Sequence, residues 1–307
     1  MEWEQRVGRR LKLRDLQTLA AVCRAGSMAK AAVELAMSQA AVSKALQEME
    51  RSLGFPVLER SSKGVCATAA GQVLLDRSRV VFDEIAEGLR EIHALADPGK
   101  GQVRVGTTEA MIGFVTGVVD SLVRTYPGIT LDFALGDTAG LIAQLRNRDL
   151  DVVITRLLPA EPADDLTTEM LFREELAVLC SKEHPAARRR RVGLADLMDE
   201  RWTLSPPELP LGRLVARVFA EKGLPLPSGV VTTVSIFLRL NLLHTAHFVT
   251  MLPRSTALQP LVRSWVKVLP VDLPAPPGSI ALLRLAHRKP SGALETFWRA
   301  AVQSVST

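Results

Sequence analysis

A single segment, residues 97–101 (Asp-Pro-Gly-Lys-Gly), separates two different apolar patterns. Upstream of it, apolar residues recur at helical spacing and no strong strand pattern occurs. Downstream of it, short apolar runs alternate with helical ones. Because Pro and Gly disfavour the interior of both helices and strands, the segment predicts a hinge between a mainly helical part and an α/β part. At 307 residues, the chain has room for about two or three domains.

Three short helices are predicted within about 40 residues of the first part. The third is the clearest, because its apolar residues form one stripe, Ser38 suits its N-cap and Gly54 suits its C-terminal end. The stripe consists of Val42, Ala45, Leu46, Met49 and Leu53. Only Ala36 and Met37 separate this helix from the second, and such tight pairing is typical of a helix-turn-helix. A small helical bundle with a polar outer face would show the same pattern.

The outward face of the third helix carries hydroxyl, amide and ammonium groups, which can reach phosphates and base edges. Its polar residues are Ser38, Gln39, Ser43, Lys44 and Gln47. Residues 55–68 then predict a turn and a basic, Gly-containing ribbon that includes Lys63. Such a ribbon beside a helix-turn-helix is similar to a wing that touches the DNA backbone.

The charge distribution is also relevant to this interpretation. The chain has a formal net charge of +5, and residues 1–68 hold 11 Lys and Arg against 7 Asp and Glu. A basic end on a near-neutral body is typical of a DNA-binding domain attached to a sensor, although a surface bias would give the same balance. The hydrophobic content of 47% excludes a disordered chain, and no apolar run reaches the ~18 residues of a membrane helix. The absence of a signal peptide and three widely spaced cysteines favour the cytoplasm.

Residues 69–97 predict one long helix with a heptad seam, which favours a dimerising linker over a helix packed on the body. The seam consists of Leu74, Ser78, Val81, Ile85, Gly88, Ile92 and Leu95. Beyond the hinge, strands and helices alternate as in βαβ units with a mostly parallel sheet. Strands are predicted at 103–107, 129–135, 150–155, 176–180, 202–204, 230–233, 248–252 and 279–285. This length suits two lobes that share a cleft.

In such folds, ligands bind at the carboxyl ends of strands, near helix N-termini. The residues predicted to line the cleft are Thr107, Thr108, Glu109, Ala110, Asp137, Thr138, Arg156, Leu204, Ser205, Pro206, Thr233 and Ser235. The hydroxyls and Arg156 suit a small carboxylate or polyol, whereas Glu109 and Asp137 oppose a simple anion. An effector that is rich in hydroxyl groups or carries an amino group is therefore a second alternative. Each residue could also serve only as an N-cap or a loop contact, and about half are expected to do so.

No sequence motif indicates catalysis. The dinucleotide, Walker and nucleophile-elbow patterns are missing, so no cofactor, catalytic residue or enzymatic activity is predicted. His244 and His247 lie three residues apart but lack a third ligand at a clear spacing, so no metal is predicted. Cys180 has no second thiol nearby in sequence, and Cys23 and Cys66 are predicted to be buried core residues.

Five segments, in order and at matching spacing, resemble the LysR-type transcriptional regulators. They are Leu16-Gln-Thr-Leu, Gly26-Ser-Met-Ala-Lys-Ala-Ala, Ser38-Gln-Ala-Ala-Val-Ser-Lys, Leu53-Gly-Phe-Pro-Val-Leu-Glu-Arg and Ala67-Thr-Ala-Ala-Gly. The resemblance extends more loosely through Arg104-Val-Gly, Tyr126-Pro, Leu150-Asp-Val-Val-Ile, His184-Pro and Leu252-Pro. The effector half is most similar to the branch that regulates sugar and aromatic-acid catabolism.

The resemblance implies an α+β multidomain protein with a winged helix-turn-helix, a long linker helix and a two-lobed α/β effector domain like a periplasmic binding protein. The implied boundaries are 1–68 for the DNA-binding domain, 69–97 for the linker, 98–101 for the hinge, 102–163 with 269–307 for lobe I, and 164–268 for lobe II. It also implies a homotetramer, built as a dimer of dimers and bound to double-stranded promoter DNA. Whether the protein also contacts RNA polymerase is not decided by the resemblance. Matching positions assign Ser38, Gln39, Ser43 and Lys44 to the recognition helix.

Arg60 and Thr68 match the wing and post-wing contacts with the DNA backbone. Ala40 and Ala45 depart from the family pattern, which puts the base contacts in doubt but not the fold. The leading hypothesis is a transcriptional regulator controlled by a carboxylate, sugar or aromatic acid. One alternative is a small-molecule-binding or metabolic protein that has a helical dimerisation segment and does not bind DNA. Another is a regulator that binds DNA constitutively and has a vestigial cleft.

Overall fold

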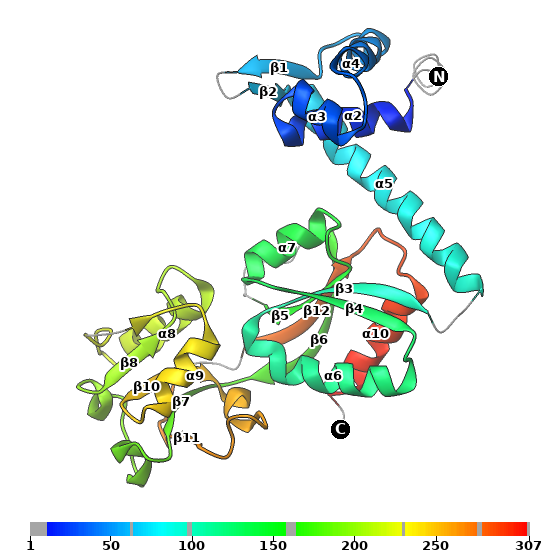
Figure 1. The fold of residues 1–307 in the computed structure, drawn as a ribbon. Helices are drawn as coiled ribbons and strands as arrows, with labels where there is room; N and C mark the ends of the chain where they lie inside the picture. The colour runs from blue at the N-terminus through cyan, green and yellow to red at the C-terminus, as the bar shows by residue number, and fades with distance from the viewer. Residues whose placement is uncertain are drawn as a thin grey trace. The chain divides into compact units, whose positions relative to one another are not determined.

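The computed structural model describes residues 11–61, 64–96, 100–157, 164–228, 231–274 and 278–305. The chain divides into two compact units, residues 1–90 and 91–307. The division falls inside the long helix α5, Ala69–Ala96 (Figure 1). Of the helices described, none combines the length and apolar character needed to cross a membrane.

The first unit is a winged helix-turn-helix. It contains α2 (Leu13–Ala25), α3 (Met28–Glu34), α4 (Gln39–Leu53), β1 (Leu58–Ser61), β2 (Gly64–Ala67) and the start of α5. The helices pack around one apolar core in which Leu19, Val22 and Val42 are fully buried. The predicted caps of α4 are confirmed, because Ser38 Oγ accepts from the Ala41 amide at 3.1 Å and Gly54 has a φ of +83°.

The turn between α3 and α4 is as tight as the sequence indicates. Ala36 takes a φ of +51°, a left-handed conformation that is uncommon for a residue with a Cβ atom. The Met37 amide then donates to the Ala32 carbonyl at 2.9 Å. The wing is attached to α4 through Glu50, whose Oε1 accepts from the amides of Val57 and Leu58. These local contacts hold α4 in a defined orientation within the unit.

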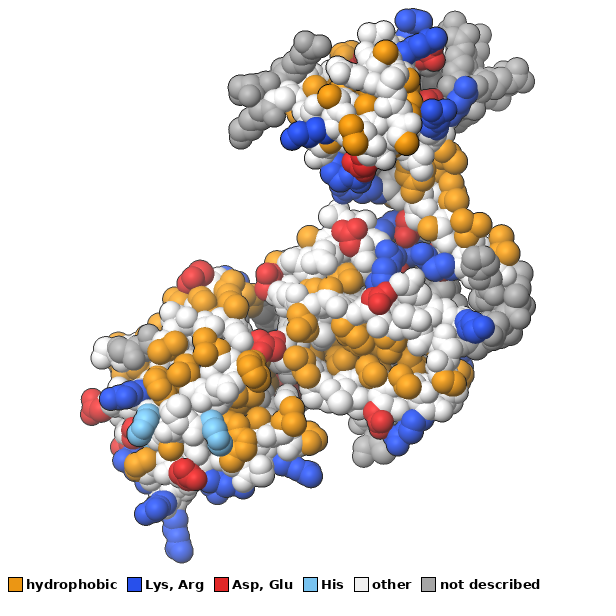
Figure 2. Space-filling view, in the orientation of Figure 1, with side chains coloured by type: hydrophobic (Ala, Val, Ile, Leu, Met, Phe, Trp, Pro, Cys, Tyr) orange, Lys and Arg blue, Asp and Glu red, His pale blue; other side chains and the backbone are white. Residues whose placement is uncertain are grey.

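Helix α5 leaves several apolar side chains exposed, and they follow the helix in Figure 2. These residues are Val73, Val81, Ile85, Leu89 and Ile92. At the first two positions of the predicted seam, Leu74 packs against the core of the first unit and Ser78 is buried within one chain. Ser78 Oγ instead donates to the Leu75 carbonyl at 2.7 Å. The side chain of Leu95 lies outside the described residues.

The second unit has two lobes, each built on a five-stranded sheet. The first lobe has the strand order β4-β3-β5-β12-β6, with β3 parallel to β4 and β5, and β12 antiparallel to β5 and β6. Its strands are β3 (Gly101–Thr107), β4 (Ile129–Leu135), β5 (Val152–Arg156), β6 (Leu166–Glu174) and β12 (Gly278–Leu285). Helices α6 (Ile112–Thr125) and α10 (Gly292–Gln303) share one apolar core, whereas α7 (Thr138–Arg146) packs into another.

The second lobe has the strand order β11-β7-β10-β8-β9. Its strands are β7 (Leu176–Ser181), β8 (Arg201–Leu204), β9 (Val231–Thr232), β10 (Phe248–Pro253) and β11 (Val266–Val268). Helix α8 (Pro210–Glu221) packs into one core of this lobe and α9 (Ile236–His244) into the other. The remaining short helices are η1 (Glu109–Met111), η2 (Pro185–Arg188), η3 (Ala195–Leu197) and η4 (Arg254–Leu258).

The structure changes one predicted lobe boundary. Strand β6 lies within residues 164–268, which were expected to form lobe II, but it pairs with β12 in the first lobe. The chain therefore passes from the first sheet to the second between β6 and β7, near Glu175. The sequence also did not predict β6, β11 or α10. Antiparallel pairing by β6 and β12 is why the first sheet is mixed rather than wholly parallel.

Candidate DNA-binding and effector sites

Helix α4 exposes part of the polar face predicted to contact DNA. Gln39, Lys44 and Gln47 are exposed, and the Lys44 side chain is 78% exposed. Lys44 Nζ lies 3.9 Å from Glu48 Oε1, a long contact between two exposed groups that leaves the ammonium free to move. Ser43 is half-buried, and the Ser38 hydroxyl already caps the helix. The free polar groups of this face are thus two amides and one cation.

The structure describes the predicted wing residues to different extents. Thr68 Oγ1 donates to the Pro56 carbonyl at 2.9 Å and accepts from the Gly71 amide at 3.0 Å. Thr68 therefore attaches the wing to the start of α5, and its hydroxyl is engaged within the unit. Arg60 belongs to β1 by its backbone, but its side chain and all of Lys63 lie outside the described residues.

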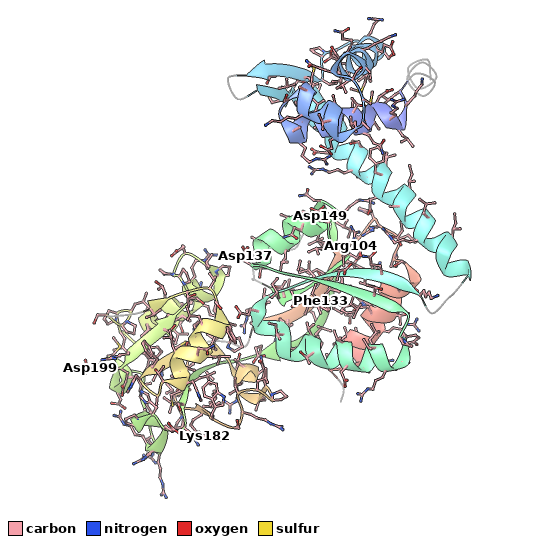
Figure 3. All side chains as sticks on the ribbon, in the orientation of Figure 1. Arg104, Phe133, Asp137, Asp149, Lys182 and Asp199 are labelled. Carbon is pink, nitrogen blue, oxygen red and sulfur yellow. The ribbon has the colours of Figure 1, made fainter. Side chains whose placement is uncertain are left out.

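A cavity of about 380 Å³ lies between the two lobes of the second unit. Its volume falls within the range of small-molecule sites. Seven of the twelve predicted effector residues line it, namely Thr108, Glu109, Ala110, Asp137, Thr138, Arg156 and Ser205. They lie at or just after the carboxyl ends of β3, β4, β5 and β8, so these strand ends do meet at one place. In Figure 3, Asp137 lies at the edge of the first lobe that faces the second.

The other five predicted residues do not line the cavity, and each makes structural contacts instead. Thr107 is 1% exposed and its hydroxyl donates to the Ile154 carbonyl, while Leu204 belongs to the apolar core of the second lobe. The Pro206 carbonyl accepts from the Leu209 amide. Thr233 Oγ1 accepts from the Ser235 amide, and Ser235 Oγ caps α9 by accepting from Leu238.

The apolar part of the cavity lining was not predicted from the sequence. The missed residues are Met111, Leu135, Gly136, Leu209, Pro210, Leu211, Val234, Ile236 and Pro253. Several belong to the start of α8 and the segment before α9, where apolar residues look like ordinary core positions. Most ligand cavities are walled by such side chains and contain only a few oriented polar groups.

The two carboxylates at the cavity are already bound to helix N-termini. Asp137 Oδ1 accepts from the Gly140 amide at 2.9 Å and so caps α7 within the first lobe. Glu109 reaches the other lobe, where Oε2 accepts from the Ile236 amide at 2.8 Å and Oε1 from the Phe237 amide at 2.7 Å. The helix dipoles thus partly neutralise the negative charge of Glu109 and Asp137. These two carboxylates therefore repel an anionic ligand less than the sequence alone indicated.

Two arginines lie at or beside the cavity. Arg156 lines it and its NH2 group donates to the Glu174 carbonyl at 3.3 Å. Burial lowers the pKa of Arg156, and the charge of Glu174 opposes this shift. Arg239, on α9, was not predicted, although it is the only charged residue in the sequence Ile236-Phe-Leu-Arg-Leu-Asn-Leu-Leu.

Arg239 is fully buried and donates to neutral oxygens. Its guanidinium donates to Thr250 Oγ1, to the Met251 carbonyl and, through NH1, to Ser205 Oγ at 3.0 Å. Burial lowers its pKa to about 10, and the charge of Glu109 opposes this shift. Arg239 therefore remains a cation at neutral pH, one hydrogen bond away from the cavity wall at Ser205.

The side chains considered for metal or redox chemistry have other surroundings. Nowhere in the described ranges do three or more His, Cys, Asp or Glu residues gather so that they could hold a metal ion. His244 instead packs edge-on against Trp265. Burial raises the pKa of the Cys180 thiol to about 12, with the charge of Glu200 adding to the effect. Cys23 and Cys66 are half-buried rather than buried as predicted.

Comparisons with known proteins match both units of the chain to one family. A family model described as LysR substrate binding domain matches residues 96–306, and one described as bacterial regulatory helix-turn-helix protein, lysR family, matches residues 13–72. The HTH-type transcriptional regulator GbpR of Azospirillum brasilense is 31% identical over 250 residues, which are 81% of this chain and 73% of that protein.

Solved structures show the same fold. Full-length CbnR in complex with its target DNA matches with a TM-score of 0.68 and 21% identity, over 96% of this chain and 100% of that chain. A full-length OxyR variant from Pseudomonas aeruginosa matches with a TM-score of 0.63 and 21% identity, over 96% of this chain and 94% of that one. The chain therefore belongs to the LysR family: it is a DNA-binding transcriptional regulator with an N-terminal helix-turn-helix domain and a two-lobed effector-binding domain, and it is not an enzyme.

Proposed function

We propose that this regulator binds promoter DNA through the exposed face of α4 and that a small molecule in the cavity between the lobes controls this binding. The observation that supports the DNA interface is the exposed set of Gln39, Lys44 and Gln47 on a helix held by a tight turn. Amides and a cation of this kind can read base edges and contact phosphates in the major groove. Arg60 and Lys63 would add wing contacts, and Ser38 and Ser43 would add contacts from the recognition helix.

Binding to the DNA upstream of its own coding sequence tests this function. We expect a gel shift with that fragment and a weaker one with a scrambled fragment of equal length. The affinity should fall steeply between low and moderate salt, because phosphate contacts release counterions; about 6–10 such contacts would cost roughly 10³–10⁵-fold between 50 and 200 mM. Equal affinity for both fragments would contradict the proposal.

The effector is proposed to be a small carboxylate, sugar or aromatic acid. The cavity supports this class because largely apolar walls are combined with Thr108, Thr138, Ser205 and the cation of Arg156. Such a ligand can regulate only if it binds two arrangements of the lobes with different affinity, which shifts their populations. In the proposed tetramer, this shift changes how two dimers contact the promoter. Identical DNase footprints with and without a saturating effector would contradict this mechanism.

A thermal-shift screen identifies the effector class. We would test aromatic acids, sugar acids, sugars, amino acids and hydroxy acids on the purified full chain. A ligand at about 100 times its Kd stabilises the state that it binds by about 2.7 kcal/mol, so a true effector gives a clear rise in Tm. Failure of all five classes would contradict the proposed effector class and favour a regulator that binds DNA constitutively.

The assembly is proposed to be a homotetramer, with α5 joining two subunits. The exposed apolar side chains of α5 support this role, because Val81, Ile85 and Ile92 lie on the predicted seam and are exposed in one subunit. The proposed compartment is the cytoplasm, where promoter DNA and RNA polymerase are both accessible.

A further inference from the structure

The N-terminus of α9 is completed by a residue from the other lobe. The first amides of a helix have no partner within the helix and need an external acceptor. Here Ser235 Oγ, the N-cap, accepts only from the Leu238 amide. The amides of Ile236 and Phe237 donate instead to the two carboxylate oxygens of Glu109, at 2.8 and 2.7 Å. Glu109 belongs to η1 of the first lobe and is 127 residues from Ile236 in sequence.

This arrangement is the one that a bound carboxylate ligand would adopt. Two adjacent backbone N–H groups each meet one oxygen of the same carboxylate, at the positive end of a helix dipole. Arg239, less than one turn into α9, is a buried cation, and among the described residues no carboxylate lies within 4.0 Å of its guanidinium. Its partners are two hydroxyls and one carbonyl. Glu109 is the anion whose charge this cation experiences.

We propose that Glu109 determines which effectors the cavity accepts, because its carboxylate fills the anion position at α9 and joins the two lobes in this arrangement. An effector that binds without opening the lobes then presents an uncharged group toward α9. Any anionic group of the effector lies toward Arg156, on the opposite wall. The part of this proposal that concerns effectors rests on the proposed function, whereas the contact between the lobes does not.

Asp137 provides the matched control. It also lines the cavity, and its carboxylate also accepts from the first turn of a helix, through the Gly140 amide of α7. Asp137 and α7 both belong to the first lobe, so this contact does not join the lobes. Loss of the Asp137 carboxylate should therefore weaken one helix cap and leave the α9 amides unchanged.

The test is hydrogen–deuterium exchange of the full chain, without DNA or effector, in peptides that cover residues 233–240. Glu109→Ala should raise the exchange of the Ile236 and Phe237 amides by roughly tenfold to hundredfold, because hydrogen bonds to a charged group contribute about 1.5–3 kcal/mol. Glu109→Gln should give a smaller increase, since the amide keeps one acceptor oxygen. Asp137→Ala should leave these peptides at the wild-type rate.

Acetate then tests whether the position is a carboxylate site. About 0.1 M sodium acetate should slow exchange in Glu109→Ala and have no effect on the wild type, with sodium chloride at equal ionic strength as the control. Wild-type exchange in β3 and β5 of the first lobe and in β7 and β10 of the second lobe would show that the variant is folded. Unchanged exchange at α9 in Glu109→Ala, or fast exchange that acetate does not slow, would each overturn the proposal. Neither result depends on DNA binding. An outcome that overturns the role of Glu109 therefore leaves the proposed function untouched, and the reverse is also true.

Discussion

The Lys44→Glu variant is expected to lose specific promoter binding while keeping its fold. Lys44 is exposed on α4, and its long contact with Glu48 is worth little to stability. Charge reversal replaces an attraction to phosphate by a repulsion, so we expect about a tenfold to hundredfold loss of affinity and a salt slope smaller by about 1. Fluorescence anisotropy with the upstream fragment over a range of salt concentrations measures both quantities.

Arg217→Glu is the matched control, because it makes the same change in net charge at an exposed position of α8 in the second lobe. It should bind the promoter fragment as the wild type does, apart from a small general charge effect. Effector-induced thermal shifts should be the same in both variants and in the wild type. Equal DNA affinity of Lys44→Glu and Arg217→Glu would show that α4 is not the DNA-binding surface.

The Asp151→Asn variant is expected to unfold far more easily than the wild type. Asp151 is buried in the first lobe and accepts from the Arg104 amide at 2.8 Å, from Arg104 Nε and NH2, and from Arg288 NH1 at 2.6 Å. Figure 3 labels Arg104 in this lobe. Removing the charge breaks the ion pairs that Asp151 makes with two arginines, and the loss of one partner of a buried ion pair typically costs about 3–5 kcal/mol. Chemical denaturation of the full chain, followed by circular dichroism and fluorescence, measures the loss.

The loss of stability caused by Asp151→Asn should become smaller as the pH falls. Burial alone would raise the pKa of Asp151, but hydrogen bonds from Arg104 and the charges of Arg104 and Arg288 outweigh it and lower this pKa. A lowered carboxyl pKa stabilises the fold fully above the unfolded value of about 3.9, and the contribution disappears as the pH falls through the lower folded pKa. The difference between wild type and Asp151→Asn should thus be constant near neutral pH and shrink below about pH 4.

Asp120→Asn is the control for this prediction. Asp120 pairs with Arg124 at 2.6 Å on the exposed surface of α6 in the same lobe. Loss of an exposed pair should change the free energy of unfolding by no more than about 1 kcal/mol. If both variants had this small effect, the buried cluster around Asp151 would not stabilise the lobe as we expect.

Several features follow from short stretches of sequence. The apolar stripe of α4, its caps at Ser38 and Gly54 and the tight turn at Ala36 all lie within 20 residues, and each was predicted correctly. The strand-end residues Thr108, Asp137 and Arg156 also line the cavity as expected. These predictions succeed because caps, turns and periodicity depend on neighbouring residues, and because parallel strands place their carboxyl ends at one edge.

Other features depend on contacts between distant residues. No local pattern marks Glu109 as the acceptor for α9, because its partners are more than 120 residues away and belong to another lobe. For the same reason, the sequence did not show that β6 pairs with β12, that Arg239 is buried beside Ser205, or that apolar residues of α8 wall the cavity. The sequence by itself determined the family, the helix-turn-helix and the edge of the sheet where the cavity lies. Only the tertiary structure decided which side chains remain free there, since packing brings each polar group to a partner that local periodicity does not encode.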